Sequence, residues 1–329
     1  MFGIYTYLLL GTTAYHAIAS FWEAKNESPP GRAIDLGGYS VHLYSQGKGK
    51  PTVIIEHSLG GSEGYFLIEE IAKFARVCIY DRPGYGWSDF SRKRRCSDAI
   101  VRELDMLLTK ANIQPPYILV GDSFGSYNVR LYAHYFPEKV AGLVFTDGLH
   151  EKEMLNMPVI VKALKLLFLS GFVMSIFGSL LGIIRILGTI GVFEIIKPEL
   201  RKFSPTQRNR IKRSFYSHRH WITMAQELWN LDCSGRQVAL ADNLNGLPII
   251  DIQSQTFLKR TALTFFMPLK TVDRLRDRIH ANFNSLSDKC VRISAKNSSH
   301  FVWTDEPEII VEAVKESIDN YINLSDKPN

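Results

Sequence analysis

Residues 121–125 (Gly-Asp-Ser-Phe-Gly) constrain the fold of this chain more than any other feature of its sequence. They follow the apolar run at residues 117–120, which is typical of a buried strand, and lead into residues 126–132, which are typical of a helix. The two glycines suit a turn so sharp that side chains beside the serine would collide with neighbouring backbone. The pattern predicts a strand, a tight turn and a helix, with the hydroxyl of Ser123 projecting above the carboxyl end of a sheet.

Apolar runs typical of strands alternate with stretches typical of helices along most of the chain. This alternation predicts an α/β fold, with a mostly parallel central sheet and helices on both of its faces. The length of 329 residues and the hydrophobic fraction of 46% fit one such domain with an insertion. The expected strands are residues 34–36, 40–45, 52–56, 77–80, 117–120, 142–146, 249–252 and 290–293. The expected helices near the sheet are residues 67–74, 98–111, 126–132, 272–283 and 307–321.

The middle of the chain breaks this alternation, because the sequence indicates helices and no strand from about residue 150 to about residue 245. A helical insertion therefore separates two strands of one sheet. We predict four parts: an N-terminal membrane anchor or signal segment (1–25), a first part of the core (26–149), a helical cap (150–246) and a second part of the core (247–329).

The N-terminal segment is apolar. Residues 2–22 contain no Lys, Arg, Asp or Glu and are about long enough to cross a bilayer as a helix. Its aromatic side chains lie towards its ends, where a membrane interface favours them. We expect a membrane-associated protein with a single-pass N-terminal anchor. Two alternatives stay open: a cleaved signal peptide followed by secretion, and a helix that packs on the protein itself.

A second uncharged stretch, residues 166–184, lies in the predicted cap. Its length suits a membrane span, but glycines interrupt it, and a single span would separate the two halves of the core. We favour an apolar cap that lines a substrate cleft and dips into lipid. Within a net charge of +6, basic runs at residues 92–95 and 201–219 indicate a solvated face or a contact with an anionic membrane. No nucleic-acid motif accompanies them, so nucleic acid is not an expected partner.

A serine hydroxyl needs a neighbouring base, usually a histidine oriented by a carboxylate, before it attacks a carbonyl group. His300 lies in a loop after the last expected strand and is the candidate base. His280 lies in a charged helix, and we expect it to face solvent. Asp147, at the tip of the strand before the cap, is the candidate carboxylate; its alternative role is to cap the turn at Gly148.

Three other aspartates suit the carboxylate position less well. Asp251 lies too early, within a strand, and Asp273 lies inside a helix. Asp305 precedes the final helix and suits its N-terminal cap. The four cysteines are widely separated and show no spacing typical of metal ligands.

The oxyanion formed during acyl transfer needs two backbone N–H donors. Phe124, which follows Ser123, and Leu59, in the turn after the third expected strand, are the candidates. Asp122 places a negative charge beside the serine, which is unfavourable unless it pairs with a cation such as Arg82.

The motifs at residues 57–61 (His-Ser-Leu-Gly-Gly), 81–88 (Asp-Arg-Pro-Gly-Tyr-Gly-Trp-Ser), 121–125 and 299–300 (Ser-His) occur in the order typical of the α/β-hydrolase superfamily. From about residue 34 to about residue 323 the chain resembles this superfamily. Within it, the chain looks most like capped serine hydrolases of a bacterial type whose substrates are largely unassigned.

The resemblance implies an α/β-hydrolase fold, a cap over the active site, and neither a metal nor an organic cofactor. It also implies an acid after the strand that precedes the cap, which agrees with Asp147. Ser58 and Ser126 stand where the superfamily usually has glycine, and Asp122 stands where histidine is frequent. These departures bear on the rate of the reaction and on the geometry of the oxyanion site.

Together these features predict a serine hydrolase that cleaves carboxylic esters of lipid-like acyl substrates through an acyl-enzyme, at a membrane surface. Ser123 attacks, His300 acts as base and then as acid, and Asp147 orients His300. The alternatives are a cofactor-free peroxidase or C–C bond hydrolase that uses the same residues, and a ligand-binding protein without turnover. Epoxide hydrolases and haloalkane dehalogenases of this fold use an aspartate nucleophile, so Ser123 argues against them.

Overall fold

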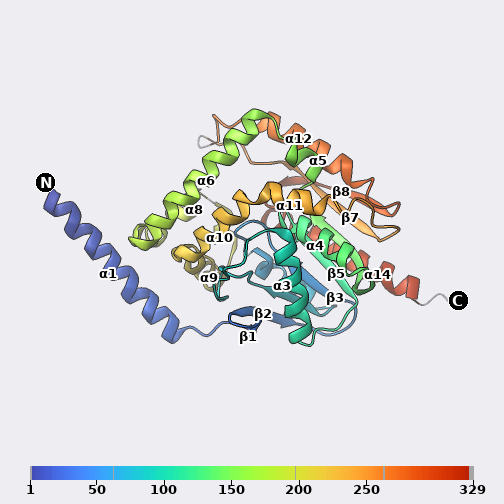
Figure 1. The fold of residues 1–329 in the computed structure, drawn as a ribbon, viewed down its shortest axis with the longest axis horizontal. Helices are drawn as coiled ribbons and strands as arrows, with labels where there is room; N and C mark the ends of the chain where they lie inside the picture. The colour runs from blue at the N-terminus through green and yellow to red at the C-terminus, as the bar shows by residue number, and fades with distance from the viewer. Residues whose placement is uncertain (1, 62, 197, 262–263, 326–329) are drawn as a thin grey trace.

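The computed structural model describes residues 2–61, 63–196, 198–261 and 264–325. Its core is one sheet with the strand order β1-β2-β4-β3-β5-β6-β7-β8 (Figure 1). β2 pairs antiparallel with both β1 and β4, whereas all other neighbours pair parallel, so the mostly parallel sheet is confirmed. The strands are β1 (Arg32–Asp35), β2 (Ser40–Gln46), β3 (Thr52–Glu56), β4 (Val77–Tyr80), β5 (Tyr117–Asp122), β6 (Val140–Thr146), β7 (Ile249–Thr256) and β8 (Cys290–Ser299).

The central strands are buried on both faces, because helices cover both sides of the sheet. Alternate residues of β3 enter different cores: Ile54 packs into the cluster that includes α3, α4 and α12, whereas Ile55 packs into the cluster that includes α2, α13 and α14. The bounds are α2 (Ile68–Ile71), α3 (Ser97–Lys110), α4 (Gly125–Tyr135), α12 (Leu269–Phe283), α13 (Val302–Asp305) and α14 (Pro307–Ser325). The helix expected at residues 67–74 is shorter than predicted, because turn residues follow Ile71; the 3-10 helix η1 (Glu63–Phe66) precedes it.

The chain between β6 and β7 forms the helices α5 to α11, which we call the helical insertion. α10 packs on α6, and α11 packs on α4 and α5, so the insertion is joined to the core close to the end of β5. The insertion comprises α5 (Glu151–Leu155), α6 (Val159–Leu180), α7 (Ile183–Thr189), α8 (Val192–Ile196), η3 (Pro198–Lys202), α9 (Pro205–Tyr216), α10 (His218–Trp229) and α11 (Leu231–Val238).

The N-terminal helix α1 (Phe2–Asn26) lies at the side of the molecule that also carries α6 and α8 (Figure 1). Within the described part of the chain, one helix is long and apolar enough to cross a membrane, and it is α6, with a mean hydropathy of 2.0. α1 is interrupted by polar residues such as Thr12, Thr13 and His16. The expected single-pass anchor at the N-terminus is therefore not supported.

Candidate active site

Ser123 lies in the turn between β5 and α4, and its φ of 48° places it in the left-handed region. A Cβ atom at Gly125 would lie 2.4 Å from the backbone oxygen of Glu56, and one at Gly121 would lie 2.6 Å from Val129 Cγ2. Only glycine therefore fits on either side of the turn without a rearrangement. The local structure is the strand, tight turn and helix that the sequence predicts.

Ser126 replaces a usual glycine without opening this turn. Its hydroxyl donates to the backbone oxygen of Ser123 (2.6 Å) and accepts from the backbone N–H of Leu149 (2.8 Å). The substitution thus ties the serine turn to the loop that follows β6, where Asp147 lies.

A cavity of about 230 Å³ lies beside this turn, and Ser123, Phe124, Leu59 and His300 all line it. The residues predicted as nucleophile, base and oxyanion donors are therefore brought to one cavity from three separate loops. The rest of its wall is mostly apolar and comes from the helical insertion and α12, including Met154, Met157, Val161, Leu164, Phe168, Leu228, Leu231, Val272, Leu275 and Ile279.

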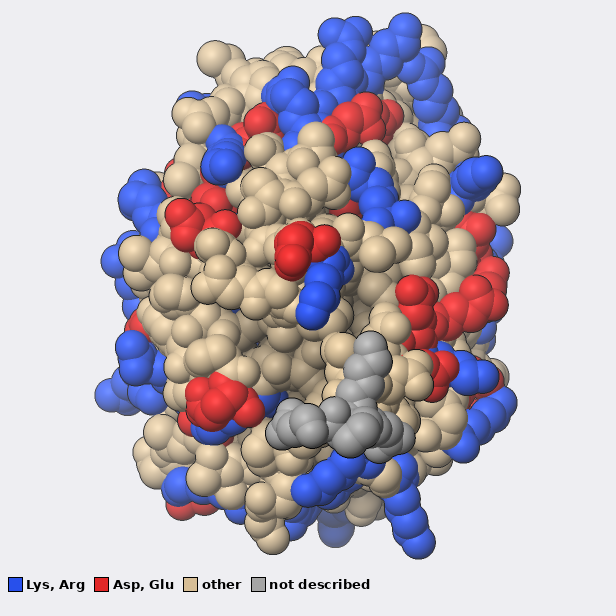
Figure 2. Space-filling model, turned by 90° about the vertical axis from the view of Figure 1, so that its right-hand side faces the viewer, with Lys and Arg blue, Asp and Glu red and all other residues tan. Residues whose placement is uncertain are grey.

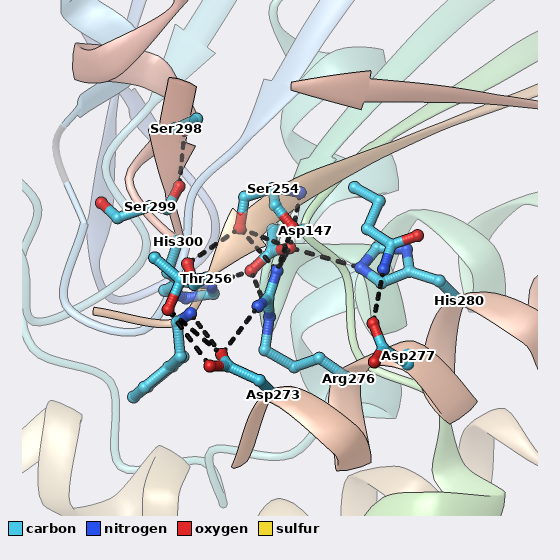
Figure 3. Close-up of polar contacts among 12 residues, drawn as sticks. Asp147, Ser254, Thr256, Asp273, Arg276, Asp277, His280, Ser298, Ser299 and His300 are labelled. Carbon is cyan, nitrogen blue, oxygen red and sulfur yellow. Dashed lines mark hydrogen bonds and ion pairs between the residues drawn. The ribbon is translucent and has the colours of Figure 1, made fainter. Parts of the chain in front are cut away.

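His300 follows β8, and its ring is bound to the carboxylate of Asp147, which follows β6 (Figure 3). The distance from His300 Nδ1 to Asp147 Oδ2 is 2.5 Å, and Asp147 is buried. An Nδ1–H that donates to the carboxylate leaves Nε2 of His300 as the proton acceptor. This is the pairing that a general base needs.

Asp147 also binds other donors. Arg276 Nε donates to its Oδ2 at 3.0 Å, and the backbone N–H and hydroxyl of Ser254 donate to its Oδ1 at 3.1 and 3.0 Å. Burial by itself raises the pKa of Asp147, but hydrogen bonds from His280 and His300 and the charge of Arg276 hold that pKa well below its usual range. The carboxylate is therefore ionised throughout the neutral range.

His280 is not solvent-facing, so that expectation is wrong. Its side chain is fully buried, with Nδ1 2.8 Å from Asp251 Oδ1 and Nε2 3.3 Å from Asp147 Oδ1 (Figure 3 shows its ring directed at Asp147). Burial lowers the pKa of His280, but the two carboxylates outweigh burial and raise that pKa to about 9. His280 and Arg276 therefore form a cationic support beneath Asp147.

The sequence contains a signal that identifies this support. The buried apolar residues of α12 recur at helical spacing, and Arg276 and His280 lie on the same stripe. The charged neighbours Asp277 and Arg278, which suggested a solvated helix, lie outside that stripe.

Protonated His280 gives the fold a pH dependence at alkaline pH. Its folded-state pKa lies above its unfolded value, so its contribution is fully present below about pH 6.5 and is lost as the pH rises through about 9. The shift corresponds to a contribution on the order of 3 kcal/mol. We expect the difference in free energy of unfolding between wild type and His280→Gln to shrink over this interval, as measured by urea titration at a series of pH values.

The matched control for that experiment is His134→Gln, because His134 is an exposed histidine at the end of α4. Its urea midpoint should follow that of the wild type at every pH. A difference between wild type and His280→Gln that stays constant from pH 6 to pH 10 would contradict the assignment of a charged His280.

The loop that carries Leu59 is held by a buried arginine. Arg82 donates from Nη1 to the backbone oxygen of His57 and from Nη2 to that of Ser58, both at 2.7 Å. Arg82 also forms buried ion pairs with Glu56 (2.9 Å) and Glu227 (3.0 Å). Arg82 is therefore paired with these two glutamates, which the sequence did not suggest.

Replacing Arg82 should destabilise the folded protein. Arg82→Met leaves two buried carboxylates without their cation, and we expect a loss of about 3–5 kcal/mol in the free energy of unfolding. Arg102→Met is the matched control, because Arg102 is 63% exposed in its pair with Asp98 and should cost at most about 1 kcal/mol. Equal urea midpoints for the two variants would show that the buried network contributes little.

The described residues contain no group of three or more His, Cys, Asp or Glu side chains placed to hold a metal ion. The carboxylates that were weighed against Asp147 have other contacts. Asp251 binds His280, Asp273 accepts from the backbone N–H of Phe257 at 2.7 Å, and Asp305 accepts from the hydroxyl of Ser299 at 2.7 Å.

A sequence model of the family described as alpha/beta hydrolase fold matches residues 51–173. Uncharacterized protein YqjL of Bacillus subtilis is 25% identical over 286 residues, which cover 86% of this chain and 90% of that protein. An uncharacterized vacuolar membrane protein of Saccharomyces cerevisiae is 34% identical over 120 residues, which cover 34% of this chain and 18% of that protein. The structure of the enol-lactonase from Burkholderia xenovorans has a TM-score of 0.60 at 13% identity, and the match covers 88% of this chain and 100% of that chain.

The sheet order, the serine turn and these matches all indicate the same fold. The chain has the α/β-hydrolase fold. The motifs predicted a likeness to the α/β-hydrolase superfamily, and the family model supports this likeness over residues 51–173.

Proposed function

We propose that this protein is a serine hydrolase that cleaves carboxylic esters of lipid-like acyl substrates. One observation carries the proposal: His300 Nδ1 lies 2.5 Å from the buried carboxylate of Asp147, and His300 shares its cavity with Ser123. A base oriented by an ionised carboxylate, beside a serine in a strained turn, is the arrangement that activates a hydroxyl for acyl transfer.

The proposed reaction uses these residues in two steps. Nε2 of His300 takes the proton of Ser123 as its oxygen attacks the ester carbonyl carbon, and the N–H groups of Leu59 and Phe124 bind the oxyanion. His300 then gives the proton to the leaving alcohol as the C–O bond breaks, which leaves an acyl-enzyme. A water molecule repeats the sequence and releases the carboxylic acid. Asp147 stabilises protonated His300 in both halves and keeps its own charge.

The walls of the cavity support an apolar acyl group as the substrate. Leucine, isoleucine, valine, methionine and phenylalanine side chains supply most of the lining, and Lys165 of α6 and Arg276 of α12 lie among them. Such a wall favours a hydrocarbon chain over a charged group. An enol-lactonase acts on a cyclic ester, and its structure shows that the fold is compatible with ester chemistry.

We also propose that the protein works at a membrane. The long apolar helix α6 forms part of the cavity wall through Val161 and Leu164. One relative is a vacuolar membrane protein, although the match covers 18% of that protein. A membrane is also where acyl substrates of this polarity are concentrated.

The test is a series of p-nitrophenyl esters from acetate to palmitate. We expect an initial burst followed by turnover, with kcat/KM rising to an acyl length that fills the cavity. Thermal stabilisation by the ligands without turnover would instead indicate the ligand-binding alternative. Activity confined to oxidation with added hydrogen peroxide, or to C–C bond cleavage, would replace ester hydrolysis by the corresponding alternative chemistry.

A further inference from the structure

One side of the molecule carries many exposed apolar side chains, from α1 and from the helices α6 and α7 (Figure 1). We call this set the apolar flank. Its exposed members include Tyr5, Tyr7, Leu8, Leu10, Ile18, Phe21, Trp22, Leu166, Leu167, Val173, Met174, Phe177, Leu180 and Ile183. Only 6% of the most apolar window of α6 is buried within the protein. Helices of this composition are normally covered.

The two parts of the flank are joined. The hydroxyl of Thr12 in α1 donates to the backbone oxygen of Leu181 at 2.7 Å, just beyond the end of α6. Gly182 is packed closely against α1, because a Cβ atom there would lie 2.3 Å from the backbone oxygen of Thr12. α1 is therefore seated on the insertion by specific contacts.

Hydroxyl groups in the flank are satisfied internally. Ser170, Ser175 and Ser179 of α6 each donate to a backbone oxygen one turn earlier, at 2.8 Å. Thr13 of α1 does the same with Leu9 at 2.8 Å. Hydroxyls on a water-exposed helix do not need these bonds, whereas in lipid they have few other partners.

The one charged residue between Lys165 and Glu194 is neutralised. Arg185 is buried, and its guanidinium is paired with Glu23 of α1, with a 2.8 Å contact from Nη2 to Oε2. The same group lies 4.5 Å from the ring centre of Tyr216. A charge buried beneath an apolar surface and paired there adds no net charge to that surface.

The contacts of α6 favour a flank that lies in the surface of a bilayer over a helix that crosses it. One side of α6 packs on α10, where the rings of Phe172 and Trp221 are 6.1 Å apart, and Val161 and Leu164 face the cavity. If α6 crossed the membrane, its residues that pack on α10 and line the cavity would have to face lipid.

Beside the flank, η3, α9 and α10 carry the basic stretch. Lys202, Lys212 and Arg213 form ion pairs with carboxylates there. Arg201 and Arg219 are exposed, and neither forms an ion pair with another described residue. The opposite side of the molecule shows acidic and basic side chains interspersed (Figure 2).

We propose that the apolar flank inserts into one leaflet of an anionic phospholipid bilayer, so that the protein is monotopic and is held by α1 and α6 together. The apolar side chains enter the acyl boundary, and the neighbouring basic residues contact the anionic headgroups. α6 then has lipid on one side and the Ser123 cavity on the other. This attachment rests on the proposal that the protein works at a membrane, but it needs no ester chemistry.

The test is flotation of the purified full-length protein with vesicles of phosphatidylcholine and phosphatidylglycerol. Leu167→Glu with Met174→Glu in α6, and separately Leu10→Glu in α1, place charges in the flank at positions that do not line the cavity. We expect the wild type to float with the vesicles, and each flank variant to lose about tenfold or more in partition coefficient. Leu240→Glu, at a leucine 60% exposed outside the flank against 62% for Leu167, should float as the wild type does.

Fluorophosphonate labelling of Ser123 and the melting temperature are read on the same samples. Unchanged labelling and melting temperature show that a flank variant is folded. Absence of labelling in the wild type would count against the proposed serine ester chemistry alone. The proposal that the apolar flank inserts into a bilayer is overturned if the wild type stays in the unbound fraction. It is also overturned if both flank variants float as the wild type does. It is equally overturned if the variants change only the association of the chain with a second copy.

Discussion

Ser123→Ala is expected to abolish covalent labelling by a fluorophosphonate and to lower kcat/KM for the best p-nitrophenyl ester by about four orders of magnitude or more. The reason is that no other hydroxyl occupies the strained turn between β5 and α4, where the serine has a φ of 48°. The substitution removes one oxygen atom, so the melting temperature should change little.

Ser285→Ala is the matched control, because Ser285 is an exposed serine in the loop after α12. It should be labelled and should turn over substrate as the wild type does. Labelling that survives in Ser123→Ala, or ester turnover within tenfold of the wild-type rate, would rule out the proposed nucleophile.

Asp147→Asn is expected to lower kcat by about three to four orders of magnitude, with a much smaller effect on KM. An amide at this position cannot stabilise protonated His300, and its NH2 group can hold the imidazole in the wrong tautomer. It also leaves Arg276 and His280 without the carboxylate that they share, so the urea midpoint should fall as well.

Asp251→Asn separates these two effects. Asp251 binds His280 but lies one residue further from the proposed reaction centre, so its loss should lower the urea midpoint and reduce kcat far less. If Asp251→Asn instead lowered kcat as much as Asp147→Asn, the assignment of the acid would be wrong. Steady-state kinetics and urea titrations on both variants give the comparison.

The membrane proposal and the catalytic proposal meet at α6. Its inner residues Val161 and Leu164 line the cavity, and its outer residues Leu167 and Met174 are exposed. A flank variant that loses vesicle binding but hydrolyses soluble short-chain esters at the wild-type rate would show that the two faces of this helix serve separate purposes.

Elements with a strong local signal could be predicted closely. The strand at residues 52–56 and the strand at residues 77–80 have the bounds that the sequence indicates, and the serine turn has the expected form. Each of these elements is determined by residues close together in the sequence. Apolar runs indicate the buried strands, and the glycines of the turn stand where a Cβ atom would collide. The pairing of Asp147 with His300 was predicted from the order of the strands, since the carboxyl ends of parallel strands meet at one edge.

Other features depend on contacts between distant segments, and here prediction was wrong or incomplete. His280 was expected to face solvent because its neighbours in sequence are charged, but Asp251 and Asp147 approach it from β7 and from the loop after β6. The partners of Arg82 were likewise missed, because Glu227 follows it by 145 positions. The single-pass anchor at the N-terminus was inferred from the absence of charge, and the hydropathy that a span needs lies in α6 instead.

The sequence by itself therefore determined the fold, the serine turn and the order of the candidate residues, because local sterics and hydrophobic periodicity act between near neighbours along the chain. The tertiary structure alone decided which charges are buried together and which apolar helices remain uncovered. Desolvation and pairing are properties of the assembled packing, and residues far apart in sequence supply both the burial and the partner.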